Sequence, residues 1–119
     1  MTVALTYSQR MAQAAYRCLE ERHHDPDFCS FARSFPSLIH ACGLAQSIAF
    51  AGAKKKGQYL DHLAQVLRAA GVPNISTTAE FEAMTRNTEV LPYVRLSRAA
   101  LQAASWLKRY AEAMSEVAS

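Results

Sequence analysis

Apolar residues recur every three or four positions over most of the chain, which is the spacing of one face of an α-helix. The first stretch of this kind predicts a helix from about Tyr7 to Arg22. Thr6 and Gln9 form a capping box at its start, in which each side chain satisfies a free N–H of the first turn. Pro26 ends the stretch, because proline disfavours helical backbone at the residue before it. The inward positions would be Met11, Ala14, Ala15, Cys18 and Leu19.

Two helices are predicted next, separated at Phe35-Pro36-Ser37. The shorter one covers roughly 26–33, and the longer one runs from the separation to about Lys56. The longer helix is apolar nearly all round, which is typical of a helix in the middle of its domain. It should end at its three lysines, with Gly57 in the left-handed position that follows many helices. One strip of it is small or polar and suits close helix contact: His40, Gly43, Ser47 and Ala51.

The second half of the chain predicts three further helices. One runs from about Gln58 to Ala70 and turns Tyr59, Leu63, Val66 and Leu67 inward. A cap at Ser76–Glu80 opens a short helix through Phe81 and Met84, and the last helix runs from between 88 and 92 to about 117. Strands, repeats and linkers have no signal in the pattern. We therefore expect residues 1–119 to form one all-α domain, a bundle of about six helices.

The last helix carries two opposed faces. Its apolar stripe consists of Leu96, Ala100, Ala103, Leu107, Tyr110, Ala111 and Met114. The opposite strip contains Arg95, Arg98 and Arg109, with Lys108 to one side and Trp106 to the other. The strip is about 21 Å long at the rise of an α-helix, so its guanidinium groups would follow several phosphates of one nucleic-acid strand. The plainer interpretation, a solvated face, is weakened because no acidic residue interrupts the strip before Glu112.

Composition fits this picture and narrows the chemistry. Half of the 119 residues are apolar and about a fifth are Ala, the best helix former. The net charge of +3 permits an anionic partner without demanding one. The start of the chain has no signal-peptide pattern and no run of 18 apolar residues occurs, so a cytoplasmic protein without a membrane partner is expected. Three cysteines without ligand spacing, Cys18, Cys29 and Cys42, are expected to be reduced and buried.

Several segments closely resemble the small subunit of the type III-B CRISPR effector, the Cmr complex. The most specific is Ser30-Phe-Ala-Arg-Ser-Phe-Pro-Ser-Leu-Ile-His-Ala-Cys-Gly-Leu-Ala-Gln46. Others are Ser8 to Tyr16, Leu96 to Leu101 and Ser105 to Ala113, whereas Gly71 to Glu89 has no such likeness.

The resemblance implies a function in antiviral defence. Such subunits are all-helical, have no nuclease activity and stack as several copies in the inner filament, next to the large polymerase-like subunit. They contact the guide RNA/target RNA duplex through basic residues, with no cofactor, metal or small-molecule substrate. The basic positions inside the matching segments are Arg10, Arg33, Arg98, Lys108 and Arg109, to which the helical pattern adds Arg95.

Two other functions remain open from the residues alone. Arg33 and His40 have a spacing found in small helical ribonucleases of the HEPN type, where the His exchanges protons and the Arg stabilises phosphoryl charge. Alternatively, the arginines pair with an acidic protein and the chain is a protein-only helical adaptor. His23-His24-Asp25 is better explained as a loop and cap than as a metal site. The aromatic residues Phe28, Phe31, Phe35 and Phe50 are expected in the core.

Overall fold

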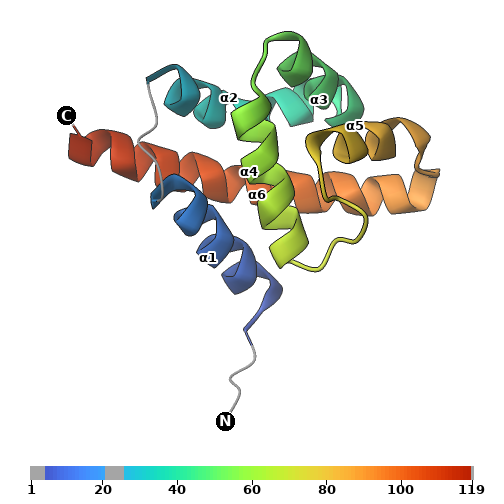
Figure 1. Cartoon of the computed structure of the whole chain (residues 1–119), viewed down its shortest axis with the longest axis horizontal. Coiled ribbons are helices and arrows are strands. Elements are labelled where there is room, and N and C mark those ends of the chain that lie inside the picture. The colour runs from blue at the N-terminus through green and yellow to red at the C-terminus, as the bar shows by residue number, and fades with distance from the viewer. Residues whose placement is uncertain (1–4, 21–25, 119) are drawn as a thin grey trace.

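The computed structural model describes residues 5–20 and 26–118, with side chains up to Met114, and this part of the chain contains only helices and turns (Figure 1). The elements in chain order are α1 (Tyr7–Glu20), α2 (Pro26–Cys42), α3 (Leu44–Ala53), α4 (Gly57–Ala69), α5 (Thr78–Asn87) and α6 (Val90–Ala118). The prediction of an all-α bundle with six helices is confirmed.

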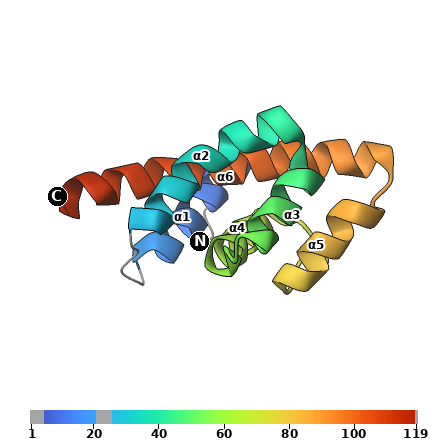
Figure 2. The ribbon, with the colours of Figure 1, turned by 90° about the horizontal axis from the view of Figure 1, so that it is seen from above.

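The long helix α6 organises the bundle. It runs the length of the molecule, with α2 along one side and α1 and α4 crossing it (Figures 1 and 2). Helices α3 and α5 pack on each other, at the end of the molecule where α6 begins. The side chains that fill the centre come from all six helices, the largest being Tyr59, Phe35, Phe81, Met11 and Leu44. The core is therefore built around α6, whose remaining face stays open.

The division between α2 and α3 lies at Gly43 and not at Phe35-Pro36-Ser37, where the sequence pattern placed it. Helix α2 continues through Pro36, whose ring is buried, so core packing offsets the hydrogen bond that proline cannot donate. At Gly43 the backbone has φ 82° and ψ 165°, a region essentially restricted to glycine. The expected strip of small residues is consequently split: Ser47 and Ala51 are buried, whereas His40 is exposed.

The turn between α3 and α4 also differs from the prediction. Helix α3 ends at Ala53, and Lys55 takes the left-handed conformation with φ 58°. Gly57, expected in that position, is instead the first residue of α4. The left-handed conformation costs more energy for a residue with a β-carbon than for glycine, so the turn carries a small backbone strain.

The other helix ends agree with the sequence pattern. Thr6 and Gln9 exchange the two hydrogen bonds of a capping box, 2.8 Å from the Thr6 N–H to Gln9 Oε1 and 3.1 Å in return. The Thr77 hydroxyl accepts a hydrogen bond from the Glu80 N–H at 3.1 Å and opens α5. Gly71, with φ 99°, follows the end of α4. Among the described residues, no helix is both long and apolar enough to cross a membrane.

Candidate nucleic-acid interface

The predicted apolar stripe of α6 faces the core. Leu96, Ala100, Ala103, Leu107 and Ala111 are buried, and the stripe's two larger members, Tyr110 and Met114, are partly buried. Since α1, α2 and α4 all cover this side of α6, the opposite side of the helix points away from the bundle.

Arg95, Arg98 and Arg109 are exposed on α6, and we call these three residues the arginine ridge. Arg98 and Arg109 lie on that open side, whereas Arg95 lies at its edge and also lines a cavity with Tyr7 of α1 and Pro73. Arg95 and Arg109 are about 21 Å apart along the helix axis. Within residues 5–20 and 26–114, none of the three makes an ion pair with a carboxylate. A row of free guanidinium groups on a straight helix is suited to phosphate oxygens, which it can contact through two parallel N–H donors each.

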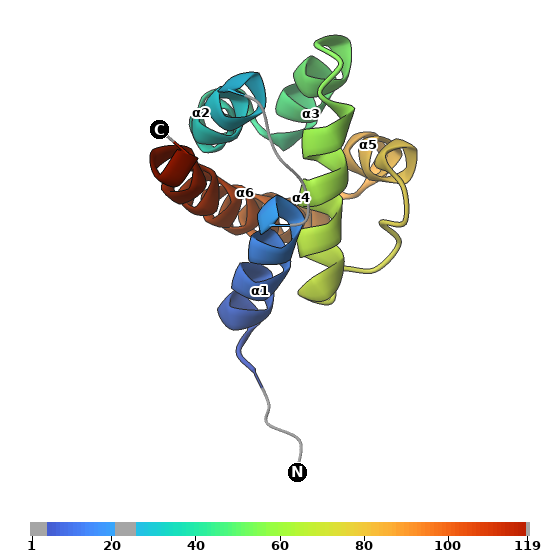
Figure 3. The same ribbon diagram turned by 60° about the vertical axis from the view of Figure 1, so that its left-hand side comes forward.

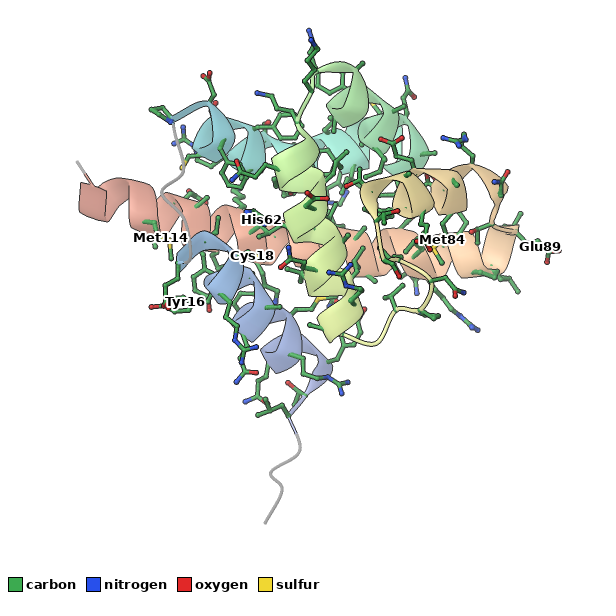
Figure 4. All side chains as sticks on the ribbon, viewed as in Figure 1. Tyr16, Cys18, His62, Met84, Glu89 and Met114 are labelled. Carbon is green, nitrogen blue, oxygen red and sulfur yellow. The ribbon has the colours of Figure 1, made fainter. Side chains whose placement is uncertain are left out.

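An aromatic cluster supports one end of the ridge. The Trp106 and Tyr110 rings stack with centroids 5.8 Å apart and planes at 19°, and the Arg109 guanidinium lies over the Trp106 ring at 5.6 Å. Tyr16 of α1 meets the edge of Tyr110 at 5.6 Å, and Figure 4 shows it projecting toward the half of α6 that carries Met114. Trp106 therefore packs on Tyr110 of its own helix, and its ring also contacts the Arg109 guanidinium.

The pKa of Tyr16 is raised, first because its hydroxyl hydrogen-bonds to Glu20 and then through the charge of that carboxylate. The hydrogen bond to the Glu20 carboxylate thus favours the protonated phenol at the edge of the aromatic cluster.

The other three predicted RNA contacts lie off the ridge. Lys108 is half-buried at the side of α6, and Arg33 is exposed on α2. Arg10 is exposed on α1, one turn beyond Tyr7, which lines the same cavity as Arg95. The structure thus brings together three of the six residues, places Lys108 beside them and leaves Arg10 and Arg33 on other helices. An RNA-binding role for each of the six stays a prediction.

The residues of the alternative ribonuclease site, Arg33 and His40, lie two turns apart on α2 and are both exposed. The groove beside them, lined by neighbouring residues of α2, includes neither side chain. Catalysis by this pair would therefore take place on an open helix surface. His23, His24 and Asp25 lie outside the described residues, and among the described ones no three potential metal ligands gather.

Two surface features were missed by the sequence pattern. Phe50, expected in the core, is 42% exposed, and of the three cysteines expected to be buried only Cys18 is, while Cys42 is exposed. The break at Gly43 accounts for Phe50, because it turns α3 away from the direction of α2, so that a face which would be internal in one long helix lies outside. It does not account for Cys29 and Cys42, which precede it on α2. At the start of α6, Val90 and Leu91 are 77% and 72% exposed. In the sequence, only their position just before Pro92 could have indicated that these two side chains are exposed.

Comparisons with known proteins agree on one family. The profile of the family described as CRISPR-associated protein (Cas_Cmr5) matches residues 7–114. A curated relative, CRISPR system Cmr subunit Cmr5 of Thermus thermophilus, is 35% identical over 117 residues, covering 93% of this chain and 97% of that protein. The crystal structure of a CRISPR-associated Cmr5 family protein from Thermus thermophilus superposes with a TM-score of 0.81 at 33% identity, covering 92% and 97% of the two chains. The chain therefore belongs to the Cmr5 family of CRISPR-associated proteins.

Proposed function

We propose that this protein is a non-catalytic small subunit of a type III-B Cmr effector complex in the cytoplasm, and that it contacts the guide RNA/target RNA duplex through the arginine ridge. Family membership supports the assembly, since a relative that matches almost end to end is named as a Cmr subunit. One observation supports the RNA contact: three exposed arginines on a straight helix without carboxylate partners in the described part of the chain.

The ridge acts through charge and shape. Each guanidinium offers a planar pair of donors that matches two phosphate oxygens, and neutralising a phosphate releases the counterions condensed around it. Arg109 is the best placed, because the stacked Trp106 ring restricts its motion before RNA arrives. Contact with the sugar-phosphate backbone does not depend on base sequence. Such contacts suit a subunit of a complex that works with guide RNAs of many different sequences.

The exposed apolar residues at the start of α6 supply a surface for neighbouring subunits. Val90, Leu91 and Val94 lie within one and a half turns and are all exposed, which is unusual for large apolar side chains so close together. We assign this patch to stacking against a further copy of the chain or the large polymerase-like subunit. A protein with a net charge of only +3 gains much of its RNA affinity through such repetition.

The test compares the assembled complex containing the wild-type chain with one containing Arg98→Glu and Arg109→Glu together. Filter binding of target RNA should weaken at least ten-fold, because two attractive phosphate contacts become repulsive. Arg86→Glu on α5, also an exposed arginine, is the matched control and should leave RNA affinity unchanged. Unaltered affinity of the double variant in a complex that assembles normally would refute the ridge as an RNA contact.

A separate experiment tests the alternative of a ribonuclease. The isolated protein is incubated with single-stranded RNA in parallel with a His40→Ala variant. We expect no hydrolysis by either protein, whereas cleavage that disappears with His40→Ala would replace our proposal by a catalytic function.

A further inference from the structure

A second surface, away from the ridge, combines aromatic rings with cations. A groove of about 580 Å³ runs between α2, the end of α3 and the start of α4, the pair of helices that stand side by side in Figure 3 with the top of α4 next to them. We call it the Phe–Lys groove, and its lining residues are Asp27, Ser30, Phe31, Ser34, Ser37, Leu38, Ala41, Phe50 and Lys56. One side is thus a helix face rich in hydroxyl groups, and the other carries the exposed phenyl ring of Phe50 and the ammonium group of Lys56.

Each aromatic ring of the groove already has an ammonium group over it. Lys54 Nζ lies 5.7 Å from the centre of the Phe50 ring, and Lys56 Nζ lies 5.5 Å from that of Phe31. The Phe50 ring is 42% exposed, so a planar ligand can reach it, whereas Phe31 is partly covered. In a nucleotide the phosphate lies close to the base. A site that binds one therefore needs an aromatic ring for the base and a cation near that ring for the phosphate.

The backbone conformation of the turn between Lys54 and Lys56 also supports a ligand site in this groove. Lys55 occupies the left-handed conformation, in which glycine would be more stable. The turn directs Lys54 to Phe50 and Lys56 to Phe31, on the two sides of the groove. None of the three lysines forms an ion pair with a carboxylate of residues 5–20 or 26–114. Three lysines without a carboxylate partner in the described part of the chain therefore lie in or next to an open groove, an arrangement that favours an anionic ligand.

We propose that the Phe–Lys groove binds a single-stranded stretch of nucleic acid, with one base stacked on Phe50 and the adjoining phosphates on Lys54, Lys55 and Lys56. The serine hydroxyls of α2 offer hydrogen bonds to the base edge or the ribose; Ser34 already donates to the Phe31 carbonyl at 3.0 Å and keeps its acceptor lone pairs. A base that stacks here is unpaired, so this site differs in ligand from the ridge, which meets a duplex backbone.

Charge favours nucleic acid over a peptide strand in this groove. Lys56 lines the groove and Lys54 and Lys55 precede it in the adjoining turn, against the single carboxylate of Asp27. An apolar peptide would find Phe31, Phe50, Leu38 and Ala41 as partners, interspersed with the serine hydroxyls and the Lys56 ammonium group. A phosphate chain instead meets cations along its length and one accessible ring for a base.

The experiment uses the full chain and a short oligouridine carrying 5-iodouridine, which on irradiation forms a covalent bond to an aromatic ring stacked on it. Cross-linked peptides identified by mass spectrometry should contain Phe50. Phe50→Ala should weaken binding of the same strand by about 5-fold to 100-fold, the range that loss of one base–aromatic stack covers. Phe50→Tyr keeps the ring and should restore affinity, which a merely destabilised fold would not do.

A lysine series provides a second readout. Lys54→Gln should lower the slope of log affinity against log salt by roughly one, as expected for the loss of one phosphate contact. Salt-independent binding, or a cross-link confined to peptides without Phe50, would overturn the proposal. Binding of the strand only through the ridge would do the same. That case is recognised because Arg98→Glu with Arg109→Glu would then abolish the cross-link, whereas under our proposal this variant keeps it.

The proposal for the arginine ridge and the proposal for the Phe–Lys groove can each be refuted without refuting the other. Loss of duplex binding in the ridge variant with an intact Phe50 cross-link supports both sites. If a protein partner covers the groove instead, Phe50→Ala will impair assembly of the complex without changing oligouridine binding, and the nucleic-acid assignment is wrong.

Discussion

The Tyr93 hydroxyl accepts a hydrogen bond from the Ala45 N–H at 3.0 Å, and so α6 caps the first turn of α3. Ala45 lies two residues after the Gly43 break, where the N–H groups of a new helix have no partner within the helix. The side chain comes from 48 residues further along the chain. This contact therefore fixes the direction in which α3 leaves α2.

Removing that hydroxyl tests its importance. Tyr93→Phe leaves the Ala45 N–H without its partner and should lower the free energy of unfolding by about 1 kcal/mol. Urea denaturation followed by circular dichroism measures the change. Tyr7→Phe, which removes a hydroxyl from an exposed tyrosine, serves as the control and should have no effect.

Two glycines on either side of α3 should respond oppositely to alanine. Gly43→Ala is expected to destabilise the protein by about 2 kcal/mol, because its φ of 82° and ψ of 165° are restricted to glycine. The new methyl itself has room, since the nearest atom, the Tyr93 hydroxyl, is 3.9 Å away. Gly57→Ala lies in helix with nothing within 4 Å and should stabilise by about 0.5 kcal/mol. Equal melting temperatures for the two variants would contradict the assigned break.

The buried Tyr59 hydroxyl predicts an alkaline instability. Burial raises the pKa of this phenol well above its ordinary value, so the folded protein keeps the proton that the unfolded chain loses above about pH 10. The stabilisation of the folded state by the protonated Tyr59 is thus fully present below that pH. As pH rises further, the free energy of unfolding falls by about 1.4 kcal/mol per pH unit. Stability curves at several alkaline pH values should show this slope, and Tyr59→Phe should remove it.

The same variant has a second expected effect at neutral pH. Within the described residues the Tyr59 hydroxyl has no hydrogen-bond partner, although the ring packs on Phe28, Phe31 and Phe35. Tyr59→Phe keeps these ring contacts and removes an unsatisfied polar group, so unfolding should become harder by about 1 kcal/mol. A marked loss of stability would show that the hydroxyl is satisfied after all.

The apolar start of α6 gives a prediction about assembly. Leu91→Glu places a charge on a side chain that is 72% exposed, so the fold of the isolated protein should be unaffected. Incorporation into the complex should fall several-fold if this patch packs on a neighbouring subunit, because a carboxylate would be buried there. Size-exclusion chromatography of the co-expressed subunits measures it, with Ala79→Glu at an exposed position of α5 as the control. Normal assembly of Leu91→Glu would exclude the patch as a stacking surface.

Periodicity determined most of the helices and the faces of α6. The stripe from Leu96 to Met114 and the opposed arginines follow from 3.6 residues per turn, which is a local property of the chain. Helix ends set by local hydrogen bonds were predicted equally well, as at Thr6 and Thr77. The family could be identified from sequence too, because the segment from Ser30 to Gln46 is specific in residue order.

Tertiary structure decided what local signals leave ambiguous. Pro36 has the local character of a helix breaker, yet its ring is buried and the helix continues. The break lies instead at Gly43, next to which the Tyr93 hydroxyl from a distant part of the chain accepts a hydrogen bond from the Ala45 N–H. Because that break redirects α3, it also decides that Phe50 faces solvent beside α2. The sequence by itself therefore determined the helical content and the two faces of α6, because both follow from local periodicity. The boundary between α2 and α3, and with it the Phe–Lys groove, was decided by the long-range packing that sets the angle between these two helices.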